Sequence, residues 1–192
     1  MTPPLAKAKA SLREQVRARL KTIPAAAHAT ASAQLCARLA QVKIFAEAKT
    51  ILFFAPLLRE IDIWPMLSDS LAAGKTTTLP RFDSATNRYV ACQIKNPTTD
   101  IGTGKFGIRE PNKLCDIVSL NRLDFILVPG IAFDLHGRRL GRGKGFYDQL
   151  LAVVRGTTCG VAFDQQIVGE IPVEPHDVHV NCILTPTRWI EL

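Results

Sequence analysis

The stretch from Val128 to Leu151 decides the fold: it reads VPGIAFDLHGRRLGRGKGFYDQLL and leads from a strand through a glycine-rich loop into a helix. The strand, Asp124–Val128, is the clearest in the chain because the apolar run FILV lies between Asp124 and Pro129. We expect the helix to run from about Phe146 to Val154. A buried strand that is followed by a loop and a helix is the repeating unit of a parallel sheet.

Short apolar runs and helical patterns alternate on both sides of this segment. We expect helices over residues 5–21, 25–42 and 62–71, and strands over residues 50–54, 76–79, 158–163 and 182–184, with residues 88–94 as a hairpin arm or an edge. Asp62 is expected to cap the third helix, and Gly74 is expected to close it. Pro80 should end the strand over residues 76–79. This order predicts the α/β class: one three-layer α/β/α domain over residues 1–192 with a largely parallel, Rossmann-like open sheet.

Composition limits the class of protein. A hydrophobic fraction of 47% with 21% charged residues argues against disorder, and no apolar run reaches the roughly 18 residues of a membrane span. The first 21 residues lack the apolar core of a signal peptide, so we expect a cytoplasmic protein with no membrane partner, although a transit peptide stays open. Five scattered cysteines without a CxxC pair predict reduced thiols rather than a disulfide framework or a zinc site.

The net charge of +7 is distributed unevenly. Residues 1–21 hold six basic side chains and one acid, and residues 138–144 hold four basic side chains and no acid, whereas residues 156–187 contain acids but no Lys or Arg. Two basic clusters and an acidic one suit a site that binds phosphate and a divalent cation. When the charge distribution is considered by itself, an ordinary solvated surface with a basic bias is the better explanation. A nucleic-acid-binding module is a rival interpretation, but aromatic residues make up only 7% of the chain, so we expect no nucleic-acid partner.

The loop itself predicts phosphate binding. Gly137, Gly141, Gly143 and Gly145 allow tight turns that bring backbone N–H groups to anionic oxygens, and basic residues among them add charge. It is not a P-loop, because Lys144 is followed by glycine rather than Ser or Thr. A glycine-rich surface turn without a ligand is the alternative. Asp148 fits a Mg²⁺ ligand and, equally well, an acid favoured by the dipole of the next helix.

The segment resembles the signature of the 5-formyltetrahydrofolate cyclo-ligase family, which has a proline–glycine after a strand, AFD, and then G-x-R-x-G-x-G-x-G-x-YD. The matching residues are Pro129-Gly130, Ala132-Phe133-Asp134, Gly137, Arg139, Gly141, Gly143, Gly145 and Tyr147-Asp148. Phe146 stands where many members carry Tyr; it keeps the ring and loses the hydroxyl.

The resemblance extends along most of the chain. Residues 9–13 are similar to the KxxLR element whose Lys and Arg reach ATP in the family, and residues 54–56 and 60–62 resemble the element that holds the pterin, where a carboxylate such as Glu60 can accept two N–H bonds. Taken alone, these residues also fit a solvated helix face and an exposed loop acid. Leu79-Pro80 and residues 106–111 resemble two further landmarks, in which Phe106 would line the folate pocket or else pack in the core.

The final segment is similar to QxxxxIPxExHD, here Gln166, Ile171-Pro172 and His176-Asp177, whose aspartate helps to hold Mg²⁺ in the family. A second family aspartate is commonly found where this chain has Asn181, so the role of that position is open. An HxxH pair, His176 and His179, could attract zinc or nickel, but a structural zinc site needs four good ligands.

The resemblance implies cyclisation of 5-formyltetrahydrofolate to 5,10-methenyltetrahydrofolate, with ATP as co-substrate, Mg²⁺ as cofactor, and phosphorylation of the formyl oxygen. It implies ATP binding by Lys9, Arg13, Arg139, Gly141, Arg142, Gly143, Lys144, Gly145, Phe146 and Tyr147. It implies substrate binding by Ala55, Glu60, Phe106 and Tyr147, catalysis by Lys144, Arg139 and Tyr147, and a metal site at Asp148 and Asp177. We expect a monomer that acts on folate with or without a polyglutamate tail. The main alternative is a paralogue that shares the ATP loop but acts on another substrate.

Overall fold

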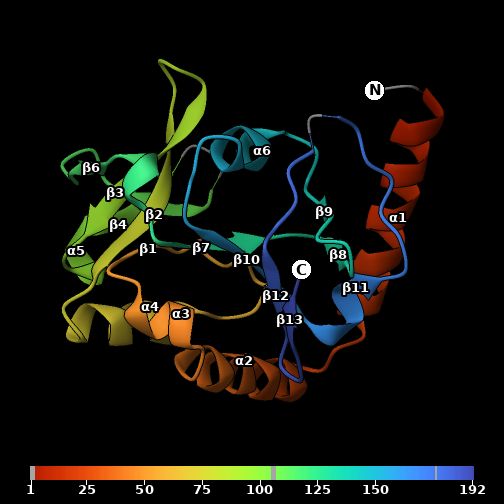
Figure 1. Ribbon diagram of the computed structural model, residues 1–192, viewed down its shortest axis with the longest axis horizontal. Coiled ribbons are helices and arrows are strands. Elements are labelled where there is room, and N and C mark those ends of the chain that lie inside the picture. The colour runs from red at the N-terminus through yellow and green to blue at the C-terminus, as the bar shows by residue number, and fades with distance from the viewer. Residues whose placement is uncertain (1–2, 105–106, 176) are drawn as a thin grey trace.

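The computed structural model describes residues 3–104, 107–175 and 177–192. Within these residues, eight strands form a central sheet in the order β13-β12-β10-β7-β1-β2-β3-β6 (Figure 1). The five inner strands are parallel: β12 (Cys182–Leu184), β10 (Thr157–Val161), β7 (Phe125–Pro129), β1 (Thr50–Leu52) and β2 (Thr76–Asp83). The outer strands are antiparallel: β3 (Arg88–Ile94), β6 (Ile117–Val118) and β13 (Trp189–Glu191). The predicted α/β class with a mostly parallel sheet is confirmed.

Helices cover both faces of the sheet (Figure 1). On one face lie α2 (Ala25–Ala40), α3 (Lys43–Glu47) and α4 (Trp64–Ala72), and on the other lies α6 (Phe146–Leu151). Alternate residues of β7 supply the two cores, since Phe125 and Leu127 face the first group of helices and Ile126 and Val128 face α6. Strands that are buried on both faces read as continuous apolar runs, which is why FILV identified β7 from the sequence.

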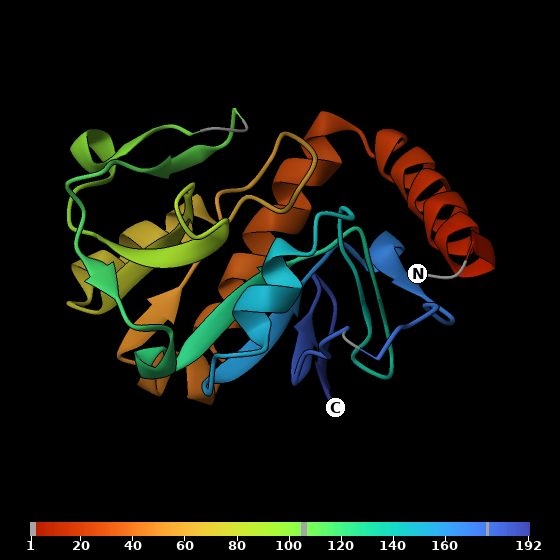
Figure 2. The same cartoon turned by 90° about the horizontal axis from the view of Figure 1, so that it is seen from above.

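The first helix, α1 (Pro3–Lys21), stands beside the sheet rather than on it (Figures 1 and 2). Its buried Val16 packs with Ile131, Leu140 and Ile171 in a separate apolar cluster. This contact fixes α1 against the segment that follows β7, and it therefore positions the basic face of the helix near the glycine-rich loop. Among the described residues, no helix combines the length and the apolar character that crossing a membrane requires.

Several local predictions need correction. The α2 helix ends at Ala40 rather than residue 42, and β10 ends at Val161 rather than residue 163. Pro80 does not stop its strand, because β2 continues to Asp83 and pairs with β3 in the hairpin that residues 88–94 complete. Thr76 and Thr78 form their backbone bonds with β1, and Pro80 faces the same side of β2. Because β1 ends at Leu52, no strand lies beside Pro80 on that side, and the N–H that proline lacks is not needed for pairing. The α6 helix ends at Leu151 rather than Val154, and β1 ends at Leu52 rather than residue 54.

The signals at the ends of α4 hold in part, because Ile63 and not Asp62 occupies the cap position before its first residue. Asp62 Oδ1 accepts a bond from Trp64 N at 3.0 Å at the start of α4, and Gly74, with φ +74°, follows its end. All five cysteines lie in the described part of the chain as free thiols, and four of them are buried.

Several short elements were not predicted. The segment after β7 holds β8 (Ala132–Asp134) and β9 (Arg139–Leu140), an antiparallel pair to which β11 (Ile167–Val168) adds a parallel strand. The excursion after β3 holds α5 (Pro97–Asp100), β4 (Ile101–Thr103) and β5 (Arg109–Pro111), and single 3₁₀ turns form at Leu120–Arg122 and Asp164–Gln166. Elements of two to four residues are too short to show a periodic pattern.

The β8–β9 hairpin is fastened to the main sheet by its aromatic residue and to the segment after β11 by its acid. Phe133 is fully buried where Gly130 and Gly160 leave space for its ring; an added Cβ on Gly160 would lie 2.5 Å from that ring. Asp134, also fully buried, accepts bonds from the backbone N–H groups of His136 (2.9 Å), Arg138 (3.1 Å) and Ile171 (2.9 Å). The hairpin is therefore a rigid base for the loop that follows it.

We expect Asp134→Asn to lower the free energy of unfolding by about 1–3 kcal/mol, because the amide group turns a donor toward buried backbone donors. Urea unfolding monitored by circular dichroism measures the change. Asp116→Asn is the control: Asp116 pairs with Lys95 at the exposed surface, where an ion pair contributes about 0–1 kcal/mol. Equal stability of the Asp134→Asn variant and the unmodified protein would contradict this role.

Candidate active site

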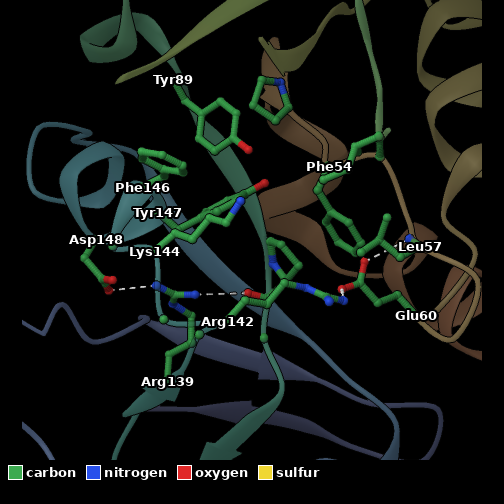
Figure 3. A pocket seen from close by; sticks show the side chains of 18 of the residues that line it. Phe54, Leu57, Glu60, Tyr89, Arg139, Arg142, Lys144, Phe146, Tyr147 and Asp148 are labelled. Atoms are coloured by element: carbon green, nitrogen blue, oxygen red, sulfur yellow. Dashed lines mark hydrogen bonds and ion pairs between the residues drawn. The ribbon is translucent and has the colours of Figure 1, made fainter. Parts of the chain in front are cut away.

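A cavity of about 170 Å³ lies at the carboxyl ends of β1 and β7, where an open parallel sheet binds its ligands (Figure 3). The segment after β1 forms one part of its wall, the loop after β9 another, and residues of β3 and β5 a third. The volume is several times the ~30 Å³ of one water molecule, so the cavity can admit a larger chemical group.

The cavity gathers most of the residues that the sequence predicted. It is lined by Ala55, Glu60, Arg139, Gly141, Arg142, Gly143, Lys144, Gly145, Phe146, Tyr147 and Asp148. Lys9, Arg13 and Asp177 do not line the cavity. Phe106 lies outside the described residues. Segments more than 80 residues apart in sequence thus meet at one place, as the expected sheet topology requires.

Arg139 is the buried cation of this site, with only 4% of its side chain exposed. Its Nη2 donates to Asp148 Oδ1 at 2.7 Å, and its Nη1 donates to the Pro129 carbonyl at 3.3 Å (Figure 3). The guanidinium carbon lies 5.7 Å from the centre of the Tyr147 ring. Gly141 leaves space for it, since a Cβ at that position would lie 2.9 Å from Arg139 Nη1. Arg139 therefore joins the end of β7, the loop and α6.

Two cations of α1 reach the same region from outside. Arg13 Nε donates to the Gly141 carbonyl at 2.9 Å. Lys9, one helical turn away, has 6% of its side chain exposed and lies 2.6 Å from Asp177 Oδ2 and 3.3 Å from Glu174 Oε2. The interpretation of Lys9 and Arg13 as a solvated helix face is therefore wrong, because both side chains tie α1 to the loop and to the segment that contains Asp177.

Across the cavity, Glu60 is bound to the loop. Its Oε1 lies 2.6 Å from Arg142 Nη2, and its Oε2 accepts a bond from Leu57 N at 3.0 Å (Figure 3). The Glu60 side chain is 13% exposed and that of Arg142 is 51% exposed, so the pair lies at the border between the cavity and solvent. Glu60 is thus not an exposed loop acid.

Aromatic rings from β3 and α6 also line the cavity. Tyr89 from β3 lies 5.5 Å from Phe146 and 5.8 Å from Tyr147, measured between ring centres. Burial raises the pKa of Tyr147, and nearby Tyr89 and Glu60 raise it further, so its phenol stays protonated and can donate a hydrogen bond at neutral pH. Sequence reasoning missed Tyr89, because it belongs to a weakly alternating strand and to no recognised motif.

The carboxylates Asp148 and Asp177 suit Mg²⁺ better than a transition metal. The described residues contain no group of three or more His, Cys, Asp or Glu side chains that could hold an ion by themselves. Mg²⁺ commonly uses one or two carboxylates together with substrate phosphates, and does not need a complete protein cage. His176 of the HxxH pair lies outside the described residues.

Asn181 has a structural contact instead of a place in the cavity. Its Oδ1 accepts bonds from the backbone N–H and the hydroxyl of Thr158, both at 2.8 Å. Asn181 precedes β12 and Thr158 belongs to β10, so the amide fastens these neighbouring strands together. The oxygen that the sequence left unassigned is therefore used for sheet pairing.

Comparison with known proteins gives a consistent result. The model of the 5-formyltetrahydrofolate cyclo-ligase family matches residues 5–186. A 5-formyltetrahydrofolate cyclo-ligase of Mycolicibacterium smegmatis is 32% identical over 96% of this chain and 96% of its own length. The Escherichia coli enzyme of that name is 31% identical over 73% of this chain and 80% of its own length.

A solved structure agrees with these relatives. The 5,10-methenyltetrahydrofolate synthetase of Aquifex aeolicus superimposes with a TM-score of 0.87 at 32% identity, covering 96% of this chain and 92% of that one. The synthetase of Mycoplasma pneumoniae, at 19% identity and a TM-score of 0.75, shares the fold. The chain is therefore an enzyme that belongs to the 5-formyltetrahydrofolate cyclo-ligase family.

Proposed function

We propose that the protein cyclises 5-formyltetrahydrofolate to 5,10-methenyltetrahydrofolate in a reaction that consumes ATP, requires Mg²⁺ and releases ADP and phosphate. The observation that carries this proposal is one cavity in which a glycine-rich loop with Arg139, Arg142 and Lys144 meets an aromatic wall and the acid Glu60. Cations and backbone N–H groups suit phosphates, whereas aromatic rings and a carboxylate suit an amino-substituted heterocycle. Membership of the family supports the same reaction.

The chemistry follows from what the substrate lacks. A formyl oxygen is a poor leaving group, so the N10 amine cannot close the ring unaided. Transfer of the ATP γ-phosphoryl group to that oxygen, with loss of ADP, makes a phosphate ester. The N10 amine then attacks the formyl carbon, and phosphate departs with the oxygen as N10 loses its proton. Such chemistry needs positioning and charge stabilisation more than a protein nucleophile.

The residues near the loop have separate tasks in this scheme. Lys144 and the buried Arg139 would stabilise charge on the transferring phosphoryl group, and the protonated Tyr147 would donate a hydrogen bond to an oxygen. The remaining ATP contacts would come from Lys9 and Arg13 of α1 and from the loop itself: Gly141, Arg142, Gly143, Gly145 and Phe146. The rigid β8–β9 hairpin would hold these groups in place before ATP arrives.

Asp148 and Asp177 would hold the magnesium ion with the ATP phosphates. When bound, the ion neutralises phosphate charge and makes the γ-phosphoryl group easier to transfer. Asp148 is paired with Arg139 and Asp177 with Lys9, so both acids already lie beside cations that attract phosphate.

The folate would contact Ala55, Glu60 and Tyr147, and also Phe106, which lies outside the described residues. Glu60 would exchange Arg142 for N–H groups of the heterocycle once a phosphate attracts Arg142. We further propose a monomer that acts in the cytoplasm on folate with or without a polyglutamate tail.

The test of the function is an absorbance assay for the methenyl product with 5-formyltetrahydrofolate, ATP and Mg²⁺ supplied together or each omitted in turn. We expect product only in the complete mixture. A folded protein that binds ATP but forms no product would favour a paralogue with another substrate.

We expect Lys144→Ala to lower kcat by roughly two to three orders of magnitude, the usual effect of removing one stabilising donor from developing charge. The fold should survive, because Lys144 is exposed on the loop. Lys43→Ala, on the far helix α3, is the matched control and should leave kcat unchanged, since Lys43 is 86% exposed. Equal kcat values for the two variants would refute the assignment of Lys144 to the transferred phosphate.

We expect Asp148→Asn to raise the Mg²⁺ concentration that gives half-maximal activity by roughly tenfold or more, because a ligating charge is lost. Titration of MgCl₂ at saturating ATP measures the shift, and thermal unfolding checks that the variant is folded. An unchanged Mg²⁺ requirement in a folded variant would remove Asp148 from the metal site.

A further inference from the structure

We propose that Glu110 is a further substrate-binding residue, whose carboxylate accepts a hydrogen bond from an N–H group of the folate's nitrogen heterocycle. Glu110 belongs to β5 and lines the cavity, yet neither the recognised motifs nor the reaction scheme gives it a task. The inference rests on the proposed function, and it extends the set of groups that recognise the substrate.

The environment of Glu110 points to a missing partner. The residue is 5% exposed, and its Oε2 accepts one long bond, 3.3 Å, from Phe82 N. Its Oε1 has no hydrogen-bond partner among the described residues and no contact with solvent. A buried carboxyl oxygen without a partner destabilises a fold, so a residue placed only for packing would be apolar there.

The chain leaves space for this carboxyl group. An added Cβ on Gly104 would lie 2.5 Å from Glu110 Oε2. The backbone of Gly104 is outside the left-handed region that favours glycine, so the requirement at this position is for space and not for conformation. The terminal torsion of a glutamate is broad, which lets the carboxyl group turn toward an occupant of the cavity.

The neighbours of Glu110 favour a nitrogen heterocycle over a phosphate. Burial raises the pKa of Glu110, which the Phe82 N–H and Arg81 oppose. Burial also raises the pKa of Tyr89, and the nearby carboxyl group of Glu110 raises it further. A carboxylate repels phosphate, whereas an N–H donor stabilises its charged form. The reduced pterin of the substrate carries N–H donors on more than one edge, so Glu60 and Glu110 can each accept from it.

Two variants test the carboxylate in different ways. Glu110→Gln keeps the shape and removes the charge, and Gly104→Ala keeps the charge but displaces the carboxyl group. Glu47→Gln is the matched control, because Glu47 lies on α3 with 67% of its side chain exposed. Calorimetry measures the Kd of 5-formyltetrahydrofolate and of a non-hydrolysable ATP analogue for each protein, and thermal unfolding checks the fold.

We expect Glu110→Gln to raise the Kd of 5-formyltetrahydrofolate about tenfold, the difference between a charged and a neutral hydrogen bond. Gly104→Ala should raise this Kd as well, because the displaced carboxylate no longer reaches the N–H group. The Kd of the ATP analogue should stay unchanged in both variants. A folate Kd equal to that of the control, or an equal loss for folate and ATP analogue, overturns the inference. Binding by the unmodified protein distinguishes failure of the proposed function from failure of the inference alone. If the unmodified protein does not bind 5-formyltetrahydrofolate, the proposed function fails and this inference with it. If it binds and the variants bind equally well, only the inference fails.

Discussion

The buried contact between Arg139 and Asp148 is the interaction on which the rest of the site depends. It joins β9 to α6 and, through the Pro129 carbonyl, to the end of β7, so the loop between them has fixed ends. A buried ion pair is poor evidence for stability, because desolvation offsets much of the attraction. Arg139 Nε, moreover, is buried without a partner in the described residues. A charge kept under these conditions at the bottom of a cavity is better explained by a ligand than by the fold.

Other charged side chains at and beside the cavity are also held in ion pairs. Arg142 is paired with Glu60, and Lys9 is paired with Asp177. In the proposed reaction the phosphates of ATP would take over the cations, while magnesium and the folate would take over the acids. Each group would thus exchange one partner for another and would not be left unpaired, which would keep the site organised before ligands bind and limit the reorganisation needed for catalysis. In the proposed scheme, the site is therefore preorganised by contacts that its ligands would replace.

The sequence was most informative where a pattern was long. The run FILV predicted β7, the helical spacing in residues 5–21 predicted α1, and the glycine loop placed Arg139, Lys144 and Asp148 at one cavity. Shorter elements such as β8 and β9 could not be predicted, since two or three residues show no period. The prediction that Pro80 ends its strand was wrong, because a proline interrupts a strand only where a neighbouring strand would accept a bond from the N–H that proline lacks. Tyr89 was missed since only the folded β2–β3 hairpin brings it to the cavity. Glu110 lies in the recognised segment 106–111, but it was given no role because its burial beside the cavity shows only in the fold.

The central claim is that the γ-phosphoryl group of ATP and the formyl oxygen of the folate meet in this cavity. The measurement that tests it most directly uses 5-formyltetrahydrofolate labelled with ¹⁸O in the formyl group, with mass analysis of the phosphate that is released. The account predicts that each phosphate carries one ¹⁸O atom, because the formyl oxygen departs with it. Unlabelled phosphate, with the label recovered in water, would contradict transfer to the formyl oxygen.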